Sequence, residues 1–253
     1  MVVCKNCTQP LSLQDNFCNS CGAQIVKNRL TTKSLFVDFY ETFFSWEANR
    51  PIKTFIDLIK KPEVVIDGYM DGVRKKYLSP IGYVAIALTL NGIFFFILNK
   101  FFPGSLENMF IAEQNNEFAK ETNKTILNLI LEYYSVAFFA FIPLYALITW
   151  IIFLNKRKYN YAEHLILNFY AYAETSIFTA LLMIGTLWSS SLLSQISVMS
   201  MGFQFIYYSY ILKRIFNLTW LQLLIKILYF LLFFVSLFMV AIIIGIIISI
   251  LRG

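Results

Sequence analysis

With 253 residues, 58% of them hydrophobic and only 14% charged, the chain lacks the composition of a soluble domain, which carries about 25% charged residues. The net charge of +6 is small for this length, and acids and bases are mixed before Ser79, which excludes a polybasic nucleic-acid-binding tail. We therefore expect an all-α polytopic membrane protein that does not bind nucleic acid. Residues 1–34 contain no apolar run of the kind a cleavable signal requires, so we expect the N-terminus to be retained.

Three regions follow from the distribution of residue types. We expect a zinc-ribbon-like head at residues 1–33, then cytosolic surface helices and a basic juxtamembrane segment at 34–79. Residues 80–253 carry apolar runs long enough to cross a bilayer and are expected to form a helical membrane domain.

All the cysteines of the chain lie in the head. Cys4 and Cys7 form one C-x-x-C pair, and Cys18 and Cys21 form a second pair ten residues later. Two such pairs can place four thiolates tetrahedrally around one Zn²⁺. The gap is shorter than the usual 15 to 20 or so residues, which favours a minimal ribbon whose folding energy comes mostly from the metal.

Two disulfides or a redox-active C-x-x-C motif are the alternatives to a metal site. Neither explains why all four cysteines gather near the N-terminus while none occurs later in the chain. In a reducing compartment this spacing favours a metal over disulfides. We predict a structural Zn²⁺ rather than a catalytic one, because four thiolates leave no open coordination position.

The surface region contains two short amphipathic stretches, residues 34–48 and 51–61. In the second, Ile52, Ile56 and Ile59 share one face with Phe55. Both stretches are too short and too charged to span a bilayer. They are expected either to lie in the plane of the membrane interface or to pack on cytosolic loops of the membrane domain, and amphipathicity alone does not separate these cases.

A basic cluster, Arg74, Lys75 and Lys76, directly precedes the first apolar run. It is expected to attract anionic lipid headgroups at about 1 kcal/mol per charge, or to act only as a positive-inside topology signal. We expect Tyr69 and Tyr77 to be interfacial anchors. An elbow is expected around the helix-breaking residues Asp67, Asp71 and Gly72.

The same region suggests a family. It contains Phe55, Leu58, Lys61-Pro62, Val65-Ile66, Tyr69, Gly72, Arg74-Lys75-Lys76-Tyr77-Leu78-Ser79-Pro80. This run resembles the segment that defines an uncharacterised bacterial membrane family, the domain of unknown function 3667. Glu163 and His164 also resemble a Glu-His pair at a matching helix start. The resemblance implies a C-x-x-C head, several membrane helices and a bacterial inner-membrane location, but no activity.

Hydropathy predicts about five transmembrane helices. Their approximate bounds are Pro80–Leu98, Tyr134–Leu154, Tyr161–Leu187, Leu192–Leu212 and Leu223–Leu251, the last long enough to tilt or to break near Gly245.

Charges in the connecting loops predict the orientation of these helices. Basic clusters at Arg74–Lys76, Lys156–Lys158 and Lys213–Arg214, the last joined by Lys226, alternate with loops that are acidic or uncharged. The positive-inside rule therefore predicts a cytosolic N-terminus and an external C-terminus. The external loop at about 99–133 is expected to be a solvated helical connector or, alternatively, a ligand lid.

Polar residues inside the predicted spans are candidates for a single intramembrane cluster, because each is costly in hydrocarbon. The candidate residues are Glu174, Gln204, Asn91, Glu163 and His164. Glu174 has no counter-ion in any span core and is expected to be protonated or hydrogen-bonded. Ser194, Ser197, Gln204 and Tyr208 form a stripe expected to face the bundle interior. The alternative is that these groups only hold helices together.

Three functions remain open. The first is a non-enzymatic membrane protein, in contact with membrane lipids, whose head docks a cytosolic protein partner or senses a condition. The second is a small transporter or channel that uses the cluster around Glu174. The third is a lipid-acting intramembrane enzyme that uses Glu163 and His164. The third is the weakest, because no catalytic set of nucleophile, base and orienting acid can be assembled.

Overall fold

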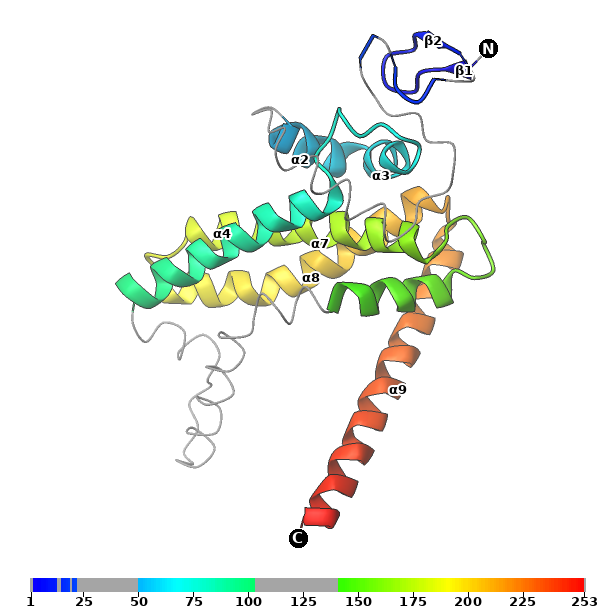
Figure 1. Cartoon of the computed structure of the whole chain (residues 1–253). Coiled ribbons are helices and arrows are strands. Elements are labelled where there is room, and N and C mark those ends of the chain that lie inside the picture. The colour runs from blue at the N-terminus through cyan, green and yellow to red at the C-terminus, as the bar shows by residue number, and fades with distance from the viewer. Residues whose placement is uncertain (1, 13–14, 19, 22–49, 103–140, 253) are drawn as a thin grey trace.

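The computed structural model describes residues 2–12, 15–18, 20–21, 50–102 and 141–252. Within these residues the protein is mostly helical, as the composition predicted (Figure 1). The strands are β1 (Val2–Val3) and β2 (Pro10–Leu11). The helices are α2 (Arg50–Lys60), α3 (Pro62–Met70), α4 (Pro80–Phe101), an unlabelled helix Phe141–Ile152, α7 (Tyr161–Ile184), α8 (Ser190–Ile215) and α9 (Trp220–Arg252).

Strands β1 and β2 form an antiparallel pair, with Val2 opposite Leu11 and Val3 opposite Pro10. The chain between them turns back on itself at the first cysteine pair, where the Cys4 amide donates to the Gln9 carbonyl at 2.8 Å. Thr8 accommodates the turn with a positive φ of 64°. The hairpin therefore brings Cys4 and Cys7 onto one compact turn.

Helices α2 and α3 are separated by a single residue because Pro62 cannot continue α2 and is well suited to start α3. They lie together on one side of α4, α7 and α8 (Figure 1). Helix α2 packs through Arg50, Thr54 and Leu58, which are one turn apart. Its predicted apolar face is not the packing face, because Ile52 is 64% exposed and Ile56 and Ile59 are also exposed.

The elbow between α3 and α4 differs in detail from the prediction. Asp67 lies within α3, and the chain turns at Asp71 and Gly72, where Gly72 has a φ of 98° that favours glycine. The prediction that Tyr69 and Tyr77 are interfacial anchors is wrong, since each is only 1% exposed. They are buried because the elbow folds back onto the body.

Helix α7 is at the centre of the body. It packs along α4 and along α8, and every residue from Ala162 to Thr175 is buried. Helices α4 and α7 run in the same direction: Tyr83 near the start of α4 bonds Glu174, whereas Phe94 packs with Met183 near the end of α7. Helix α9 leaves the bundle and extends away from it (Figure 1).

Among the described residues, α4 and α7, with 22 and 24 residues, are the helices long and apolar enough to cross a membrane by length and composition. Helix α8 covers the predicted fourth span with slightly wider bounds, and α9 continues through Gly245 without a break. Of the predicted second span, only the helix Phe141–Ile152 is described. The amphipathic stretch at 34–48 and the loop from 103 onward lie outside the described residues.

Replacing Thr54 tests how α2 is attached. The Thr54 hydroxyl donates to the Arg50 carbonyl and accepts from the Leu78 amide at 3.0 Å, and this bond is buried. Thr54→Val keeps the shape but removes the acceptor, so the free energy of unfolding should fall by about 1 to 3 kcal/mol. Thr89→Val is the control, because the Thr89 hydroxyl donates to the Ala85 carbonyl of its own helix at an exposed position. Equal thermal unfolding midpoints for the two variants in detergent would contradict this account.

Candidate functional site

The four cysteines form a compact group that could hold one metal ion. Their sulfur atoms all lie within 4.8 Å of one another, with Cys4 and Cys21 at 3.7 Å and Cys7 and Cys18 at 3.5 Å. These distances are too long for disulfides. A tetrahedral metal with bonds of about 2.3 Å separates its sulfur ligands by about 3.8 Å, so the thiols fit such a metal closely. Cys4 and Cys18 are buried, which shields the centre of the group.

The structure does not gather the five predicted polar residues into one cluster. Glu163 belongs to a capping box at the start of α7: its carboxylate accepts from the Asn160 amide, and its own amide donates to the Asn160 side chain. Glu174 is eleven residues further on, or about 16 Å along the helix axis. Because α7 is buried on all sides there, a shared helix face does not create a shared pocket.

Glu174 instead pairs with Tyr83, which the sequence analysis did not single out. The Tyr83 hydroxyl donates to Glu174 Oε2 at 2.5 Å. The carboxyl group is almost fully buried, and its Oε1 has no hydrogen-bond partner among the described residues. Asn91 lies further along α4 and donates to the Ser176 hydroxyl at 2.7 Å.

His164 is in a third environment. It is 1% exposed, its Nδ1 lies 3.1 Å from the Thr149 hydroxyl, and its ring stacks on Phe216. Asn168 is one helical turn away and donates through its amide nitrogen to Thr149 and to the His164 carbonyl. Its spacing of four from His164 was the sequence signal that could have identified Asn168. His164 is thus part of a buried hydrogen-bond group rather than at an open mouth.

The polar stripe on α8 faces the bundle interior only in part: Tyr208 donates to the Asn168 carbonyl of α7 at 3.5 Å. Gln204 is exposed and Ser194 and Ser197 are only half-buried. The residues that α8 buries are Leu193, Tyr207, Ile211 and Ile215. Packing follows these larger side chains because they bury more apolar surface than serine does.

The three residues of the basic cluster differ in burial. Arg74 is half-buried, with its guanidinium 5.7 Å from the centre of the Tyr69 ring. Lys75 and Lys76 are exposed. The headgroup contact stays a prediction, and these two lysines are the more accessible members of the cluster.

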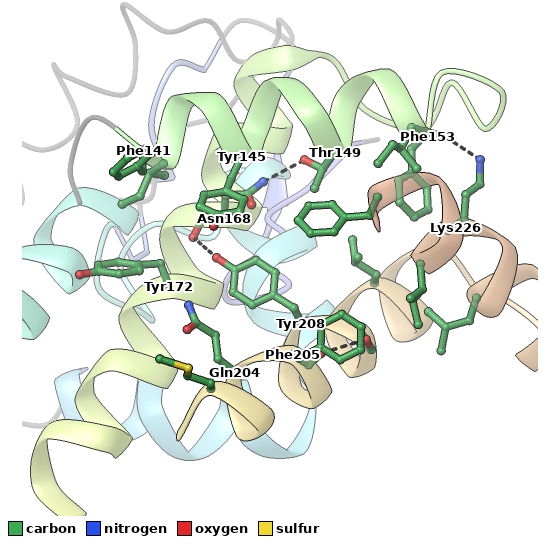
Figure 2. Close-up of a pocket in the computed structure, with 18 residues that line it drawn as sticks. Phe141, Tyr145, Thr149, Phe153, Asn168, Tyr172, Gln204, Phe205, Tyr208 and Lys226 are labelled. Atoms are coloured by element: carbon green, nitrogen blue, oxygen red, sulfur yellow. Dashed lines mark hydrogen bonds between the residues drawn. The ribbon is translucent and has the colours of Figure 1, made fainter. Parts of the chain in front are cut away.

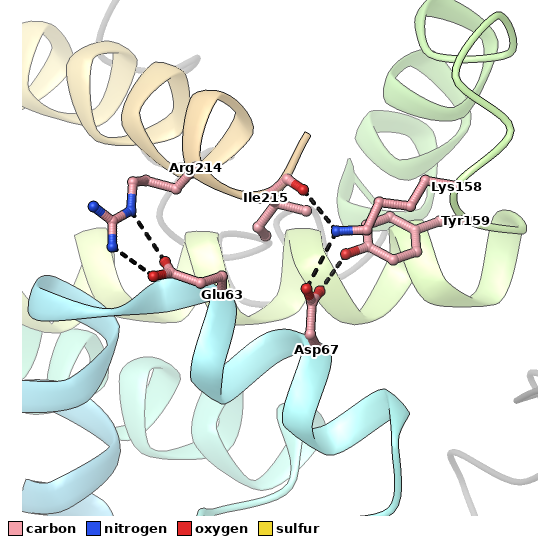
Figure 3. A network of polar contacts seen from close by, with 6 residues as sticks. All are labelled: Glu63, Asp67, Lys158, Tyr159, Arg214 and Ile215. Carbon is pink, nitrogen blue, oxygen red and sulfur yellow. Dashed lines mark hydrogen bonds and ion pairs between the residues drawn. The ribbon is translucent and has the colours of Figure 1, made fainter. Parts of the chain in front are cut away.

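Ion pairs join α3 to the end of α8 and to the residues just before α7 (Figure 3). Arg214, at the end of α8, donates two hydrogen bonds to Glu63, and this interaction lowers the pKa of the Glu63 carboxyl. Asp67 accepts from the Tyr159 hydroxyl and from Lys158 at 3.2 Å. Burial, followed by the contact with Asp67, raises the pKa of Tyr159. These contacts fix α3 at the end of the bundle where α7 begins and α8 ends.

A cavity of about 400 Å³ lies between the helix Phe141–Ile152 and α7, α8 and α9 (Figure 2). Aromatic rings make up much of its wall, and the Gln204 amide lies between Tyr172 and Tyr208. Thr149 and Asn168 contribute buried polar groups. Glu174 and Tyr83 do not line this cavity.

Comparison with known proteins gives one result that bears on the fold. Residues 49–92 match a family described as a protein of unknown function, DUF3667. No curated protein and no solved structure matches the chain. The matched stretch comprises α2, α3, the elbow and the first half of α4, so the resemblance noted in the sequence is confirmed for this segment.

Replacing Glu63 tests the attachment of α3. A lowered folded-state pKa means that the Glu63 pair stabilises the protein above the unfolded-state pKa and loses this effect as pH falls through the folded-state value. Glu63→Gln should therefore lower stability slightly at pH 7, by about 0.5 kcal/mol because the pair is partly exposed. The difference from wild type should shrink as pH falls below the unfolded-state pKa of about 4.3 and vanish below the lowered folded-state pKa.

Unfolding midpoints of wild type, Glu63→Gln, Arg214→Gln and the double variant, measured at pH 7 and at a pH below the folded-state pKa of Glu63, separate the pair from its surroundings. A coupling energy that persists unchanged at the lower pH would disprove the role assigned to this pair.

Proposed function

Because residues 49–92 match the family DUF3667, we propose that the chain is a non-enzymatic bacterial inner-membrane protein whose cytosolic head holds a structural Zn²⁺ and docks a protein partner. The observation that carries this proposal is the group of four thiols within 4.8 Å of one another on a head joined to a helical body. A closed tetrathiolate site stabilises a fold and offers no open position for catalysis.

The proposal includes five spans, with the N-terminus in the cytosol. The one-sided gathering of basic residues supports this orientation. Lys158 donates to the Ile215 carbonyl, Arg214 bonds Glu63 of α3, and Arg74 packs over Tyr69 of α3. Three basic clusters separated in sequence therefore meet at the end of the bundle that also carries α3, as expected for a cytosolic end.

The exposure of an ion pair between the described residues of the head and the body supports docking through the head. Lys5 and Asp71 form an ion pair at 2.8 Å in which both side chains are 59% exposed. Such exposed pairs contribute little to stability. A partner that binds the head can therefore displace this ion pair at little cost.

The first test concerns the metal and the partner together. Purified wild-type protein should contain one Zn²⁺ per chain, and Cys18→Ser with Cys21→Ser should contain none.

In cells, crosslinking from the head should capture a cytosolic protein with wild type but not with the cysteine variant at equal abundance. Lys5→Ala is the control, since Lys5 is in the head but ligates no metal. Capture that survives loss of the metal would disprove docking through the folded head.

The second test concerns topology. In a variant without native cysteines, Lys156→Cys should be protected from an impermeant thiol reagent in intact cells, whereas Glu117→Cys should react. Lys156 is chosen because it is exposed and does not cap a helix. The reverse labelling pattern would invert the orientation.

A second candidate function is transport of protons or a cation through Glu174. The supporting observation is that Glu174 Oε1 is buried without a hydrogen-bond partner among the described residues. A carboxyl group used only for packing normally has both oxygens satisfied. The lipid-acting enzyme is not favoured, because the capping box uses the Glu163 carboxylate and the Thr149 hydroxyl contacts His164 Nδ1.

The third test separates packing from transport. Glu174→Gln keeps an acceptor for the Tyr83 hydroxyl but removes the ionisable group. If Glu174 only packs, the variant should match wild type in abundance and in ability to complement a deletion strain. If it carries charge, the variant should fold but fail to complement. Tyr83→Phe is the companion variant, since it removes the hydrogen bond and keeps the carboxyl group. A fully functional Glu174→Gln protein would rule out transport through this residue.

A further inference from the structure

The cavity of about 400 Å³ has a polar floor and an apolar mouth. Its volume is within the range of pockets that bind small molecules. Around the mouth, Phe141, Met201 and Phe205 are exposed, whereas Thr149 and Asn168 on the floor are buried. Gln204 is also exposed there, so a molecule that enters passes mostly apolar side chains before it reaches the buried polar ones.

Asn168 determines what the floor can bind. Its amide nitrogen donates to the His164 carbonyl at 2.8 Å and to the Thr149 hydroxyl at 3.0 Å. Because a backbone carbonyl only accepts, the nitrogen must be on that side, which fixes the amide orientation. Asn168 Oδ1 is then left as an acceptor. The residue is fully buried, and Oδ1 has no hydrogen-bond partner among the described residues.

A buried acceptor without a donor is costly, by about 1 to 3 kcal/mol. Oδ1 has almost no accessible surface, so a ligand that brings a hydroxyl group to it must shift the side chains around it, and the new hydrogen bond then removes this cost. The one cation in the cavity wall, Lys226, already donates to the Ile152 carbonyl and to Asn155. The Lys226 charge disfavours a cationic donor, and an anionic carboxylate has no hydrogen to give to Asn168 Oδ1, so an uncharged hydroxyl group fits this wall best.

We propose that this cavity binds a lipophilic alcohol, an uncharged molecule with an apolar body among the aromatic rings and a hydroxyl group that donates to Asn168 Oδ1 (Figure 2). This inference rests on the membrane location in the proposed function, because the apolar mouth then opens to the lipid phase. It is independent of the zinc head and of Glu174.

The test uses a long-chain alcohol that carries a diazirine, and its methyl ether as the matched probe without a donor. Both are added to the full-length protein in phospholipid vesicles, and crosslinked residues are identified by mass spectrometry. The alcohol should label Tyr145, Met201 and Phe205 about threefold to tenfold more than the ether, the range expected for one net hydrogen bond.

Three variants complete the test. Ser209→Trp should fill the cavity and abolish labelling, whereas Ser236→Trp should not, since Ser236 is exposed on α9 and makes the same kind of bond to its own helix. Asn168→Leu should bring the alcohol-to-ether ratio to about one. Abundance and vesicle flotation are measured for each variant.

The outcomes are distinguishable. Protein that does not float with the vesicles overturns the membrane location. Protein that floats but is labelled equally by alcohol and ether, or is labelled no more in the cavity than on the exposed surface of α9, overturns the alcohol site alone.

Discussion

Burial of α7 on every side over residues 162–175 is the constraint on which the rest of the structure depends. A helix enclosed in this way must have its polar side chains satisfied by neighbouring elements, because water does not reach them. Glu163 closes a capping box, His164 meets Thr149, and Glu174 meets Tyr83. The surrounding helices are therefore positioned by hydrogen bonds to α7 as well as by apolar packing.

The DUF3667 segment supplies much of that enclosure. The Tyr170 hydroxyl of α7 donates to the Leu78 carbonyl at 2.6 Å, and the Tyr170 ring meets Tyr69 edge to face. Gly72 provides the turn that returns the chain to the body, and Pro80 starts α4 at the point of contact. Gly72, Tyr69 and Pro80 of the matched segment thus have structural roles in the elbow, and these roles assign no activity.

Two oxygen atoms on α7 stand apart from this arrangement. Glu174 Oε1 belongs to the carboxyl group that pairs with Tyr83 of α4, Asn168 Oδ1 belongs to a residue that lines the cavity, and neither atom has a partner among the described residues. Buried polar atoms without a partner are uncommon, and the proposed charge transport and the proposed ligand site rest on these two. They are distinct sites, because one pairs with Tyr83 and the other belongs to the hydrogen-bond group of His164 and Thr149.

Local features were determined by the sequence itself. The spacing of Cys4, Cys7, Cys18 and Cys21 predicted their convergence, and proline and apolar length predicted the start of α4, because these signals act within a few residues. Only the tertiary structure decided what lies across from each side chain. It buried Tyr69 and Tyr77, exposed the apolar face of α2, and separated Glu174 from Gln204, since helical periodicity reports that a face exists but not which neighbour covers it.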